Sequence, residues 1–257
     1  IDAIVAAGTT GEGSTLTDEE HREVLRYTVE RVNHRVPVIA GTGSNDTAYA
    51  IDLTKYACEI GVDGILLVTP YYNKPSDEGI FRHFEAVSKV GMPIIVYNIA
   101  GRTGKNISTS LLCRIVELPN IAGVKEASGD INQMMDVIAK ISRKKPEFSV
   151  LSGDDGLTLP LIAAGGDGVI SVVSNIAPAL VTELVTKALE GKFDEARDIH
   201  YRLLPFFKAA FVDGNPTSIK YAMNYKGLPA GGLRLPLVEV HEEAKKIIEK
   251  ALKECNL

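Results

Sequence analysis

The sequence has few cysteines and no cysteine motif. Its 257 residues include only Cys58, Cys113 and Cys255, which lie far apart and form no C-x-x-C pair. This odd number and wide spacing argue against a disulfide framework and a cysteine-ligated zinc site. The chain also lacks a run of about 18 apolar residues that could cross a bilayer. We therefore expect a protein of the reducing cytoplasm, without a membrane as partner.

Signals for nucleic-acid, nucleotide and metal binding are also missing. The chain has 28 basic and 33 acidic residues, a net charge of −5, and no basic face is evident to bind phosphates. No G-x-G-x-x-G follows a predicted strand, and the loop 8–13 lacks the G-K-[S/T] of a P-loop. Asp154 and Asp155 have no evident histidine or glutamate partner. We expect no nucleic acid, no nucleotide and no metal.

Apolar runs that alternate with helical segments make up most of the chain. The runs are continuous, as in strands buried on both faces, and strict alternation with helices predicts a parallel sheet. Seven strands are predicted, near residues 3–7, 37–41, 64–68, 93–97, 121–125, 148–152 and 168–172. Seven units are one short of an eight-stranded (β/α)8 TIM barrel, which is the fold class that we predict. A doubly wound open sheet competes, but it usually carries a dinucleotide fingerprint.

The pattern after residue 193 changes to helices alone. Helices are predicted near residues 194–211, 218–226 and 239–255. We therefore expect residues 1–191 to form the α/β barrel that carries the active site, and residues 192–257 to form a helical region packed on it. All five histidines fall in predicted helices or at their ends, and we interpret them as surface or interface residues: His21, His34, His83, His200 and His241.

A lysine and a tyrosine end two neighbouring predicted strands. In an α/β barrel the carboxyl ends of the strands converge on the face that holds the active site. Partial burial favours the neutral amine of Lys125, which can then attack a carbonyl and form a Schiff base. Tyr97 could shuttle the protons that this chemistry requires. For an isolated strand-end lysine, the alternative is a side chain that extends into solvent.

Three further polar side chains follow predicted strands. The Thr9 and Thr10 hydroxyls could relay protons or orient the phenol, and Arg102 could bind a substrate carboxylate through two hydrogen bonds. Each also has a structural interpretation: turn-forming threonines, and an arginine that caps carbonyl groups. Their joint occurrence at strand ends favours a Schiff-base site over these separate interpretations.

Five motifs give the chain a resemblance to a known family. They are G-T-T-G-E at 8–12, T-P-Y-Y-N-K-P at 69–75, Y-N at 97–98 with R-T-G at 102–104, V-K-E-A at 124–127, and L-S-G-D-D at 151–155. With them the chain resembles the pyruvate-dependent class I aldolases, and among these the dihydrodipicolinate synthases, over essentially its full length. The resemblance implies a barrel with one further strand–helix unit before residue 1, and no cofactor besides the lysine.

The resemblance implies a catalytic group of four residues. Lys125 would form the Schiff base with pyruvate, while Tyr97, Thr10 and Tyr72 would form a proton relay. Tyr72 would reach into the site from a neighbouring subunit. The catalytic unit would then be at least a dimer, usually within a homotetramer built as a dimer of dimers.

The resemblance also implies how substrates bind. Thr9 and Thr10 would hold the carboxylate of pyruvate, and Arg102 would bind the carboxylate of aspartate β-semialdehyde. Gly153 and Ile170 would contribute main-chain contacts. The expected activity is the condensation of these two substrates to 4-hydroxy-tetrahydrodipicolinate, a step of lysine and diaminopimelate biosynthesis.

The chain departs from the family pattern at three places. Ile99 and Ala100 replace the usual Val-Pro before the arginine loop, and Thr217-Ser218 replaces the usual Ile-Pro after Asn215-Pro216. Tyr49 stands where lysine-inhibited members have a glutamate, so weak or absent inhibition by lysine is expected.

Two alternative functions remain open. One is a sister aldolase such as N-acetylneuraminate lyase or a 2-keto-3-deoxy sugar acid aldolase, which shares the lysine and the tyrosine. The Thr9-Thr10 pair and the segment 102–104 favour the synthase over these sisters. The other is a catalytically silent barrel that acts as a binding protein, because fold alone does not determine function.

Overall fold

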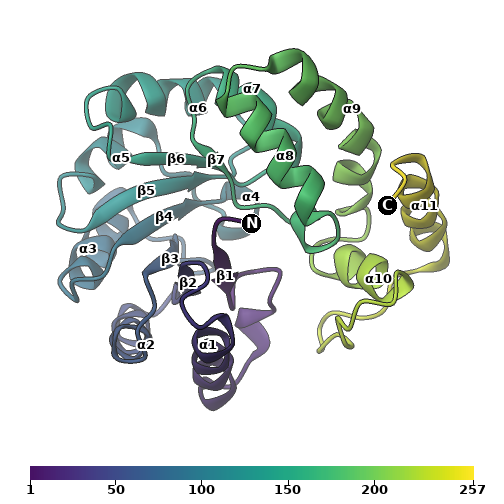
Figure 1. Cartoon of the computed structure of the whole chain (residues 1–257). Coiled ribbons are helices and arrows are strands. Elements are labelled where there is room, and N and C mark those ends of the chain that lie inside the picture. Colours follow the sequence, from purple (N-terminus) through teal and green to yellow (C-terminus); the bar gives the residue numbers. More distant parts are fainter.

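A curved parallel sheet of seven strands organises the computed structural model, which describes residues 1–257. Each strand pairs with the next one along the chain, and β1 and β7 form the two edges, so the strands follow the path of an incomplete α/β barrel (Figure 1). The strands are β1 Ile4–Ala6, β2 Val38–Gly41, β3 Gly64–Val68, β4 Ile94–Asn98, β5 Ile121–Glu126, β6 Ser149–Ser152 and β7 Gly168–Val169. All seven predicted strands are confirmed.

The last strand is shorter than the predicted run 168–172. Ile170 still donates its amide to the Ser152 carbonyl, 2.9 Å away, but the next segment leaves the sheet. The Asp155 carboxylate accepts hydrogen bonds from the amides of Val172 and Val173 at 3.0 and 3.2 Å. Because these amides are satisfied by a side chain, the chain turns away after β7.

Helices follow the strands, and most of them lie along the outer side of the sheet, whereas the short α4 lies inside its curve (Figure 1). They are α1 Asp18–Val32, α2 Thr47–Glu59, α3 Asp77–Ser88, α4 Ala100–Thr103, α5 Thr109–Ile115, α6 Ile131–Val137, α7 Thr158–Ala163 and α8 Pro178–Leu189. Single turns occur at η1 Gly13–Thr15, η2 Ile138–Ser142, η3 Asp155–Leu157 and η4 Val173–Asn175. None of the helices combines the length and apolarity needed to span a membrane.

A capping box formed by Thr17 and Glu20 begins α1. The Glu20 amide donates to Thr17 Oγ1 at 3.2 Å, and the Thr17 amide donates to Glu20 Oε2 at 2.9 Å. These two bonds satisfy amides that have no partner within the helix. They fix the point at which the loop after β1 becomes helix, and this loop carries Thr9 and Thr10.

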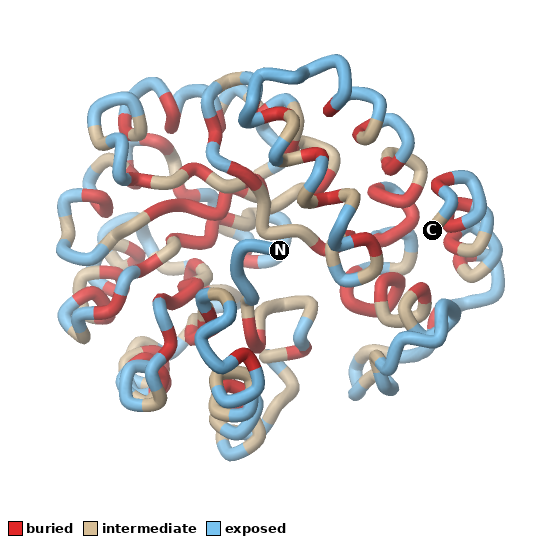
Figure 2. Tube along the Cα trace, viewed as in Figure 1, coloured by how far each residue is buried: buried red, intermediate tan, exposed pale blue.

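The apolar core has two parts. One cluster of 31 buried residues fills the space between the sheet and helices α1, α2, α3, α5, α6 and α7, and buried positions run along the strands in Figure 2. A second cluster of 21 residues joins α7 and α8 to the C-terminal helices α9 Phe193–Ala209, α10 Thr217–Tyr225 and α11 Glu242–Glu254. The second cluster contains residues of both α8 and α9, so this part of the core crosses the predicted domain boundary between residues 191 and 192. That boundary stays a prediction.

Three histidines are buried, so their assignment as surface or interface residues is wrong. His21 lies with Nε2 2.9 Å from the Gly41 carbonyl, and His83 lies with Nδ1 2.9 Å from Thr47 Oγ1. His200 is buried in α9 against Phe207. Each occupies the inward face of its helix, and burial lowers the pKa of His83 to about 4.

Candidate active site

Lys125 and Tyr97 occupy paired positions on neighbouring strands. The register of β4 and β5 places Tyr97 beside Lys125, and residues paired in this way point to the same side of a sheet. The Lys125 Nζ atom lies 4.3 Å from the centre of the Tyr97 ring. Only 8% of Lys125 and 5% of Tyr97 is exposed. The predicted neighbours therefore form a buried amine–phenol pair.

The surroundings of Lys125 favour its neutral form. Burial lowers its pKa from 10.5 to about 8; the Arg102 guanidinium lowers it as well, while the Asp155 carboxylate acts in the opposite direction. At pH 7 a pKa of about 8 leaves roughly one amine in ten neutral, compared with about one in three thousand for an exposed lysine. The extension of Lys125 into solvent is excluded, because only 8% of this residue is exposed.

Tyr97 remains protonated at neutral pH. Burial raises the pKa of its phenol above the ordinary value, and a hydrogen bond with the Thr9 side chain and the charge of Arg102 oppose this shift. A protonated phenol can donate a proton, and its oxygen can accept one back. Tyr97 therefore has the properties of a proton donor beside the amine.

Gly153 provides the space beside the lysine. A Cβ atom at this position would lie 2.5 Å from the Ala127 Cβ and 3.1 Å from the Lys125 Cε. The Gly153 amide donates to the Glu126 carbonyl at 2.8 Å, which fixes the end of β6 against the end of β5. The absence of a side chain thus allows the main chain of β6 to approach Lys125 closely.

Thr10 and Arg102 both contact a residue outside the predicted set. The Asn215 amide group donates to Thr10 Oγ1 at 3.0 Å, and Arg102 Nη2 donates to the Asn215 carbonyl at 2.8 Å. Arg102 thus caps a carbonyl, as in its structural interpretation, although it is exposed and its charge acts on Lys125. A pocket of about 100 Å³ lies here, bordered by Thr9, Arg102 and Asn215.

Tyr72 is not brought to Lys125 by its own chain. Its side chain is 89% exposed, and its backbone adopts a positive φ of 71°. The contribution of Tyr72 to a neighbouring subunit therefore stays a prediction. The roles of Thr9, Gly153 and Ile170 toward substrate also stay predictions.

A polar network behind the catalytic face was missed by sequence reasoning. The register places Asn98 beside Glu126, one position after the amine–phenol pair and on the opposite side of the sheet. The Glu126 carboxylate accepts from Asn98 Nδ2 at 3.0 Å, from Gln133 Nε2 at 2.9 Å and from the Ser128 amide at 2.8 Å. These bonds tie the ends of β4 and β5 to α6. The only signal for this network in the sequence was that Glu126 directly follows Lys125.

Asp155 organises the neighbouring loop. It is buried, its carboxylate accepts hydrogen bonds from Ser171 and from two backbone amides, and burial raises its pKa. No group of three or more histidine, cysteine, aspartate or glutamate side chains is arranged to hold a metal ion. The other aspartate of the pair, Asp154, accepts a hydrogen bond from the Gly156 amide at 2.8 Å.

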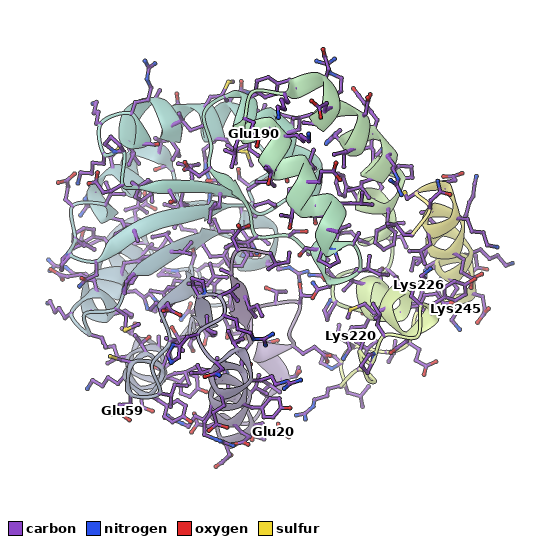
Figure 3. All side chains as sticks on the ribbon, in the orientation of Figure 1. Glu20, Glu59, Glu190, Lys220, Lys226 and Lys245 are labelled. Carbon is purple, nitrogen blue, oxygen red and sulfur yellow. The ribbon has the colours of Figure 1, made fainter.

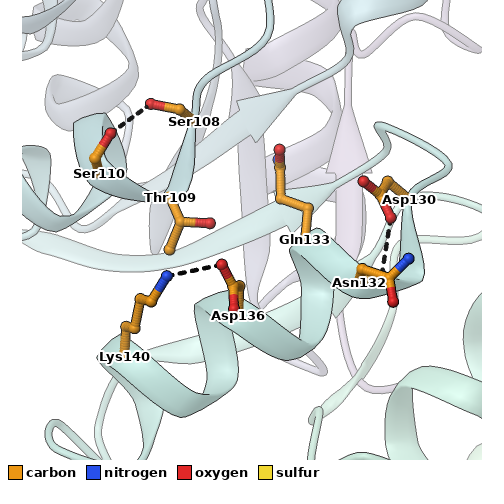
Figure 4. Close-up of a pocket in the computed structure, with 8 residues that line it drawn as sticks. All are labelled: Ser108, Thr109, Ser110, Asp130, Asn132, Gln133, Asp136 and Lys140. Atoms are coloured by element: carbon orange, nitrogen blue, oxygen red, sulfur yellow. Dashed lines mark hydrogen bonds and ion pairs between the residues drawn. The ribbon is translucent and has the colours of Figure 1, made fainter.

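A larger pocket, with a volume of about 490 Å³, lies away from the amine–phenol pair. Figure 4 shows it between α5 and α6, where its lining is entirely polar. Lys140 pairs there with Asp136, and Asp130 accepts from the Asn132 amide. These polar groups thus form an ion pair and a hydrogen bond with one another. None of the predicted site residues lines this pocket.

Comparisons with known proteins agree on one family. The family model described as the dihydrodipicolinate synthetase family matches residues 1–255. A 4-hydroxy-tetrahydrodipicolinate synthase of Protochlamydia amoebophila is 51% identical over 255 residues, covering 99% of this chain and 85% of that protein. One of Methanocaldococcus jannaschii is 49% identical over 259 residues, covering 100% and 88%.

Solved structures show the same fold. The 4-hydroxy-tetrahydrodipicolinate synthase of Methylacidiphilum fumariolicum superposes with a TM-score of 0.97 at 46% identity, covering 100% of this chain and 85% of that one. The dihydrodipicolinate synthase of Thermotoga maritima superposes with a TM-score of 0.96 at 40% identity, covering 100% and 88%. These matches confirm the predicted barrel fold. The chain belongs to the dihydrodipicolinate synthetase family.

Proposed function

We propose that the chain condenses pyruvate with aspartate β-semialdehyde to form 4-hydroxy-tetrahydrodipicolinate. The observation that carries this function is the buried Lys125 amine, whose pKa is lowered to about 8, lying 4.3 Å from the ring centre of Tyr97. A lysine with this environment is suited to nucleophilic attack on a carbonyl. The relatives described above, which share about half of the sequence, are named for the same product.

The neutral amine of Lys125 attacks the C2 carbonyl of pyruvate and forms a carbinolamine. Tyr97 donates a proton to the carbinolamine hydroxyl, which leaves as water, and a C=N bond replaces the C–O bond. Loss of a proton from the pyruvate methyl group then gives an enamine. The enamine carbon attacks the aldehyde carbon of the second substrate, whose oxygen takes up a proton, and the new C–C bond regenerates the imine. The amino group of aspartate β-semialdehyde then attacks the imine carbon, closes the six-membered ring and releases Lys125 as the free amine.

The remaining residues bind and orient the two substrates. Thr9 and Thr10 hold the carboxylate of pyruvate, and the exposed guanidinium of Arg102 attracts that of aspartate β-semialdehyde. Gly153 and Ile170 contribute main-chain contacts, and Tyr72 completes the relay from a neighbouring copy in a homo-oligomer. The enzyme works in the cytoplasm with no metal or nucleotide cofactor.

Trapping with borohydride tests this function directly. Incubation with pyruvate and sodium borohydride should reduce the imine and leave a stable adduct on Lys125, identified by peptide mass spectrometry. Borohydride without pyruvate is the control. An unmodified Lys125 after treatment with pyruvate would contradict the Schiff-base function and favour a silent binding protein.

Substrate comparison then separates the synthase from its sister enzymes. The enzyme should consume aspartate β-semialdehyde when pyruvate is supplied, and it should not cleave N-acetylneuraminate or a 2-keto-3-deoxy sugar acid when either is supplied without pyruvate. The reverse preference would assign the chain to a sister aldolase.

The pH dependence of imine formation should follow the lysine. Since Lys125 must be neutral to attack, and its pKa is about 8, the rate of adduct formation should rise through pH 7 to 9 with a midpoint near pH 8. The measurement is the initial rate of trapping at saturating pyruvate across this range. A rate that still rises steeply at pH 10 would show that burial does not lower the pKa.

A further inference from the structure

Asp155 is a buried carboxylate without a cationic partner. Only 3% of it is exposed, and no lysine, arginine or histidine forms an ion pair with it. Glu12, which is also buried, pairs with Lys220 of α10, labelled in Figure 3. Glu126, the third buried carboxylate, faces the opposite side of the sheet from Lys125. Because burial of an unpaired charge is costly, the charge of Asp155 points to a role in the site.

The hydrogen bonds of Asp155 favour its ionised form. The Ser171 hydroxyl donates to Oδ1, and the amides of Val172 and Val173 donate to Oδ2 at 3.0 and 3.2 Å. Backbone amides can only donate, so a protonated carboxyl would present its own hydrogen to these donors. Burial raises the pKa of Asp155, the three hydrogen bonds lower it, and the charge of Asp154 raises it.

The loop that carries Asp155 begins against Lys125. The register of β5 and β6 places Leu151 beside Lys125. The main chain approaches the lysine most closely at Gly153, where a Cβ atom would lie 3.1 Å from the Lys125 Cε. Asp155 follows two residues later. Burial lowers the pKa of Lys125, the Asp155 carboxylate raises it, and the Arg102 guanidinium lowers it.

A carboxylate at this place opposes the first chemical step and favours the next. Lys125 must be neutral to attack pyruvate, whereas a negative charge stabilises its ammonium form. When the carbinolamine hydroxyl leaves as water with a proton from Tyr97, the nitrogen lone pair forms the C=N bond and the nitrogen becomes a positively charged iminium. Loss of a methyl proton neutralises this charge as the enamine forms. Formation of the C–C bond then restores it.

We propose that Asp155 is the countercharge of the iminium, and that its buried carboxylate stabilises the positive nitrogen that forms twice on Lys125 in each turnover. The inference rests on the proposed function, which supplies the iminium. A fixed charge in a site that excludes water stabilises a developing charge without reorganisation of solvent. Since the carboxylate forms no ion pair with the free amine, the attack on pyruvate remains possible.

Replacement of Asp155 by asparagine removes the charge and keeps the shape. Its oxygen can still accept from the two backbone amides, and its NH2 group can donate to Ser171 Oγ. We expect kcat to fall about tenfold, less than the roughly 10²- to 10³-fold loss for a donor in direct contact. The pH midpoint of pyruvate trapping should move from near pH 8 to lower pH, because loss of a negative charge lowers the pKa of Lys125 further.

Asp155→Ala separates the charge from the structure of the loop. Alanine also lacks the charge, but it loses all three hydrogen bonds. A countercharge predicts that both variants shift the midpoint to lower pH by a similar amount. A purely structural role predicts that the asparagine variant behaves like the unmodified protein and that only the alanine variant loses activity.

Asp167→Asn is the matched control. Asp167 is an exposed aspartate just before β7, at the end of the strand opposite to the catalytic face, and its carboxylate accepts from the Val150 amide at 2.7 Å. The same chemical change there should keep kcat within about twofold and leave the midpoint near pH 8.

Either charge-free variant that folds carries the test. Partial unfolding would expose Lys125 and raise its pKa, so it cannot produce the expected shift to lower pH. A midpoint that stays near pH 8 or moves to higher pH, or an unchanged kcat in Asp155→Asn, would overturn this inference alone if the unmodified protein still traps pyruvate. Failure of the unmodified protein to trap pyruvate would overturn the proposed function as well.

Discussion

Replacement of Lys125 by methionine should abolish the trapped pyruvate adduct and lower turnover about 10⁴-fold or more, as expected when a covalent nucleophile is removed. Methionine matches the length of the lysine chain but has no amine. Since the site is 8% exposed and disfavours a charge, the apolar side chain should fit without loss of stability. Peptide mass spectrometry and steady-state kinetics measure the two effects.

Lys140→Met is a suitable control for this variant. Lys140 lies at the outer pocket and pairs with Asp136 on the surface, so its loss should leave both the adduct and the turnover unchanged. Retention of a pyruvate adduct in Lys125→Met would show that another amine is the nucleophile. A melting temperature well below that of the unmodified protein would instead attribute lost activity to unfolding.

Tyr97→Phe should lower kcat about 10²- to 10³-fold, the range typical of a lost general acid–base group. The phenylalanine ring keeps the packing against the Lys125 amine, 4.3 Å from the ring centre, and removes only the phenol oxygen. The lowered pKa of Lys125 should therefore persist, and the adduct should still form, more slowly. The measurements are kcat and the time course of borohydride trapping.

An exposed tyrosine supplies the control for the loss of a hydroxyl. Tyr201 on α9 is 63% exposed, and Tyr201→Phe should leave kcat unchanged. If Tyr97→Phe trapped pyruvate and turned over at the unmodified rate, the relay would not pass through Tyr97.

The fold and the centre of the site could be predicted because both follow from a local pattern. Continuous apolar runs alternating with helices predict parallel strands, and parallel strands bring their carboxyl ends to one edge. The pairing of Tyr97 with Lys125 follows from this rule, and the register confirms it. No other structural knowledge is needed to place an amine beside a phenol.

The parts that could not be predicted depend on contacts between distant segments. Asn215 lies in a loop between helices, where no periodicity indicates which residues it will contact. His21 and His83 are buried because they lie on the helix faces that meet the sheet. The pattern of an amphipathic helix does not show to which face a single histidine belongs. Tyr72 is exposed in the single chain, so its predicted role would depend on a neighbouring subunit.

The alternation along β5 has a consequence for folding fidelity. Lys125 and Glu126 are neighbours in the strand and therefore face opposite sides of the sheet. Lys125 faces Tyr97, and Glu126 faces the polar network with Asn98. A slip of β5 by one residue in one direction would place Glu126 opposite Tyr97, and a slip in the other direction would place Lys125, which cannot accept hydrogen bonds, opposite Asn98. The hydrogen bonds of Glu126 with Asn98 and Gln133 thus favour the correct pairing of β5 with β4. A misregistered molecule would lose the amine–phenol pair and the hydrogen bonds of Glu126 together.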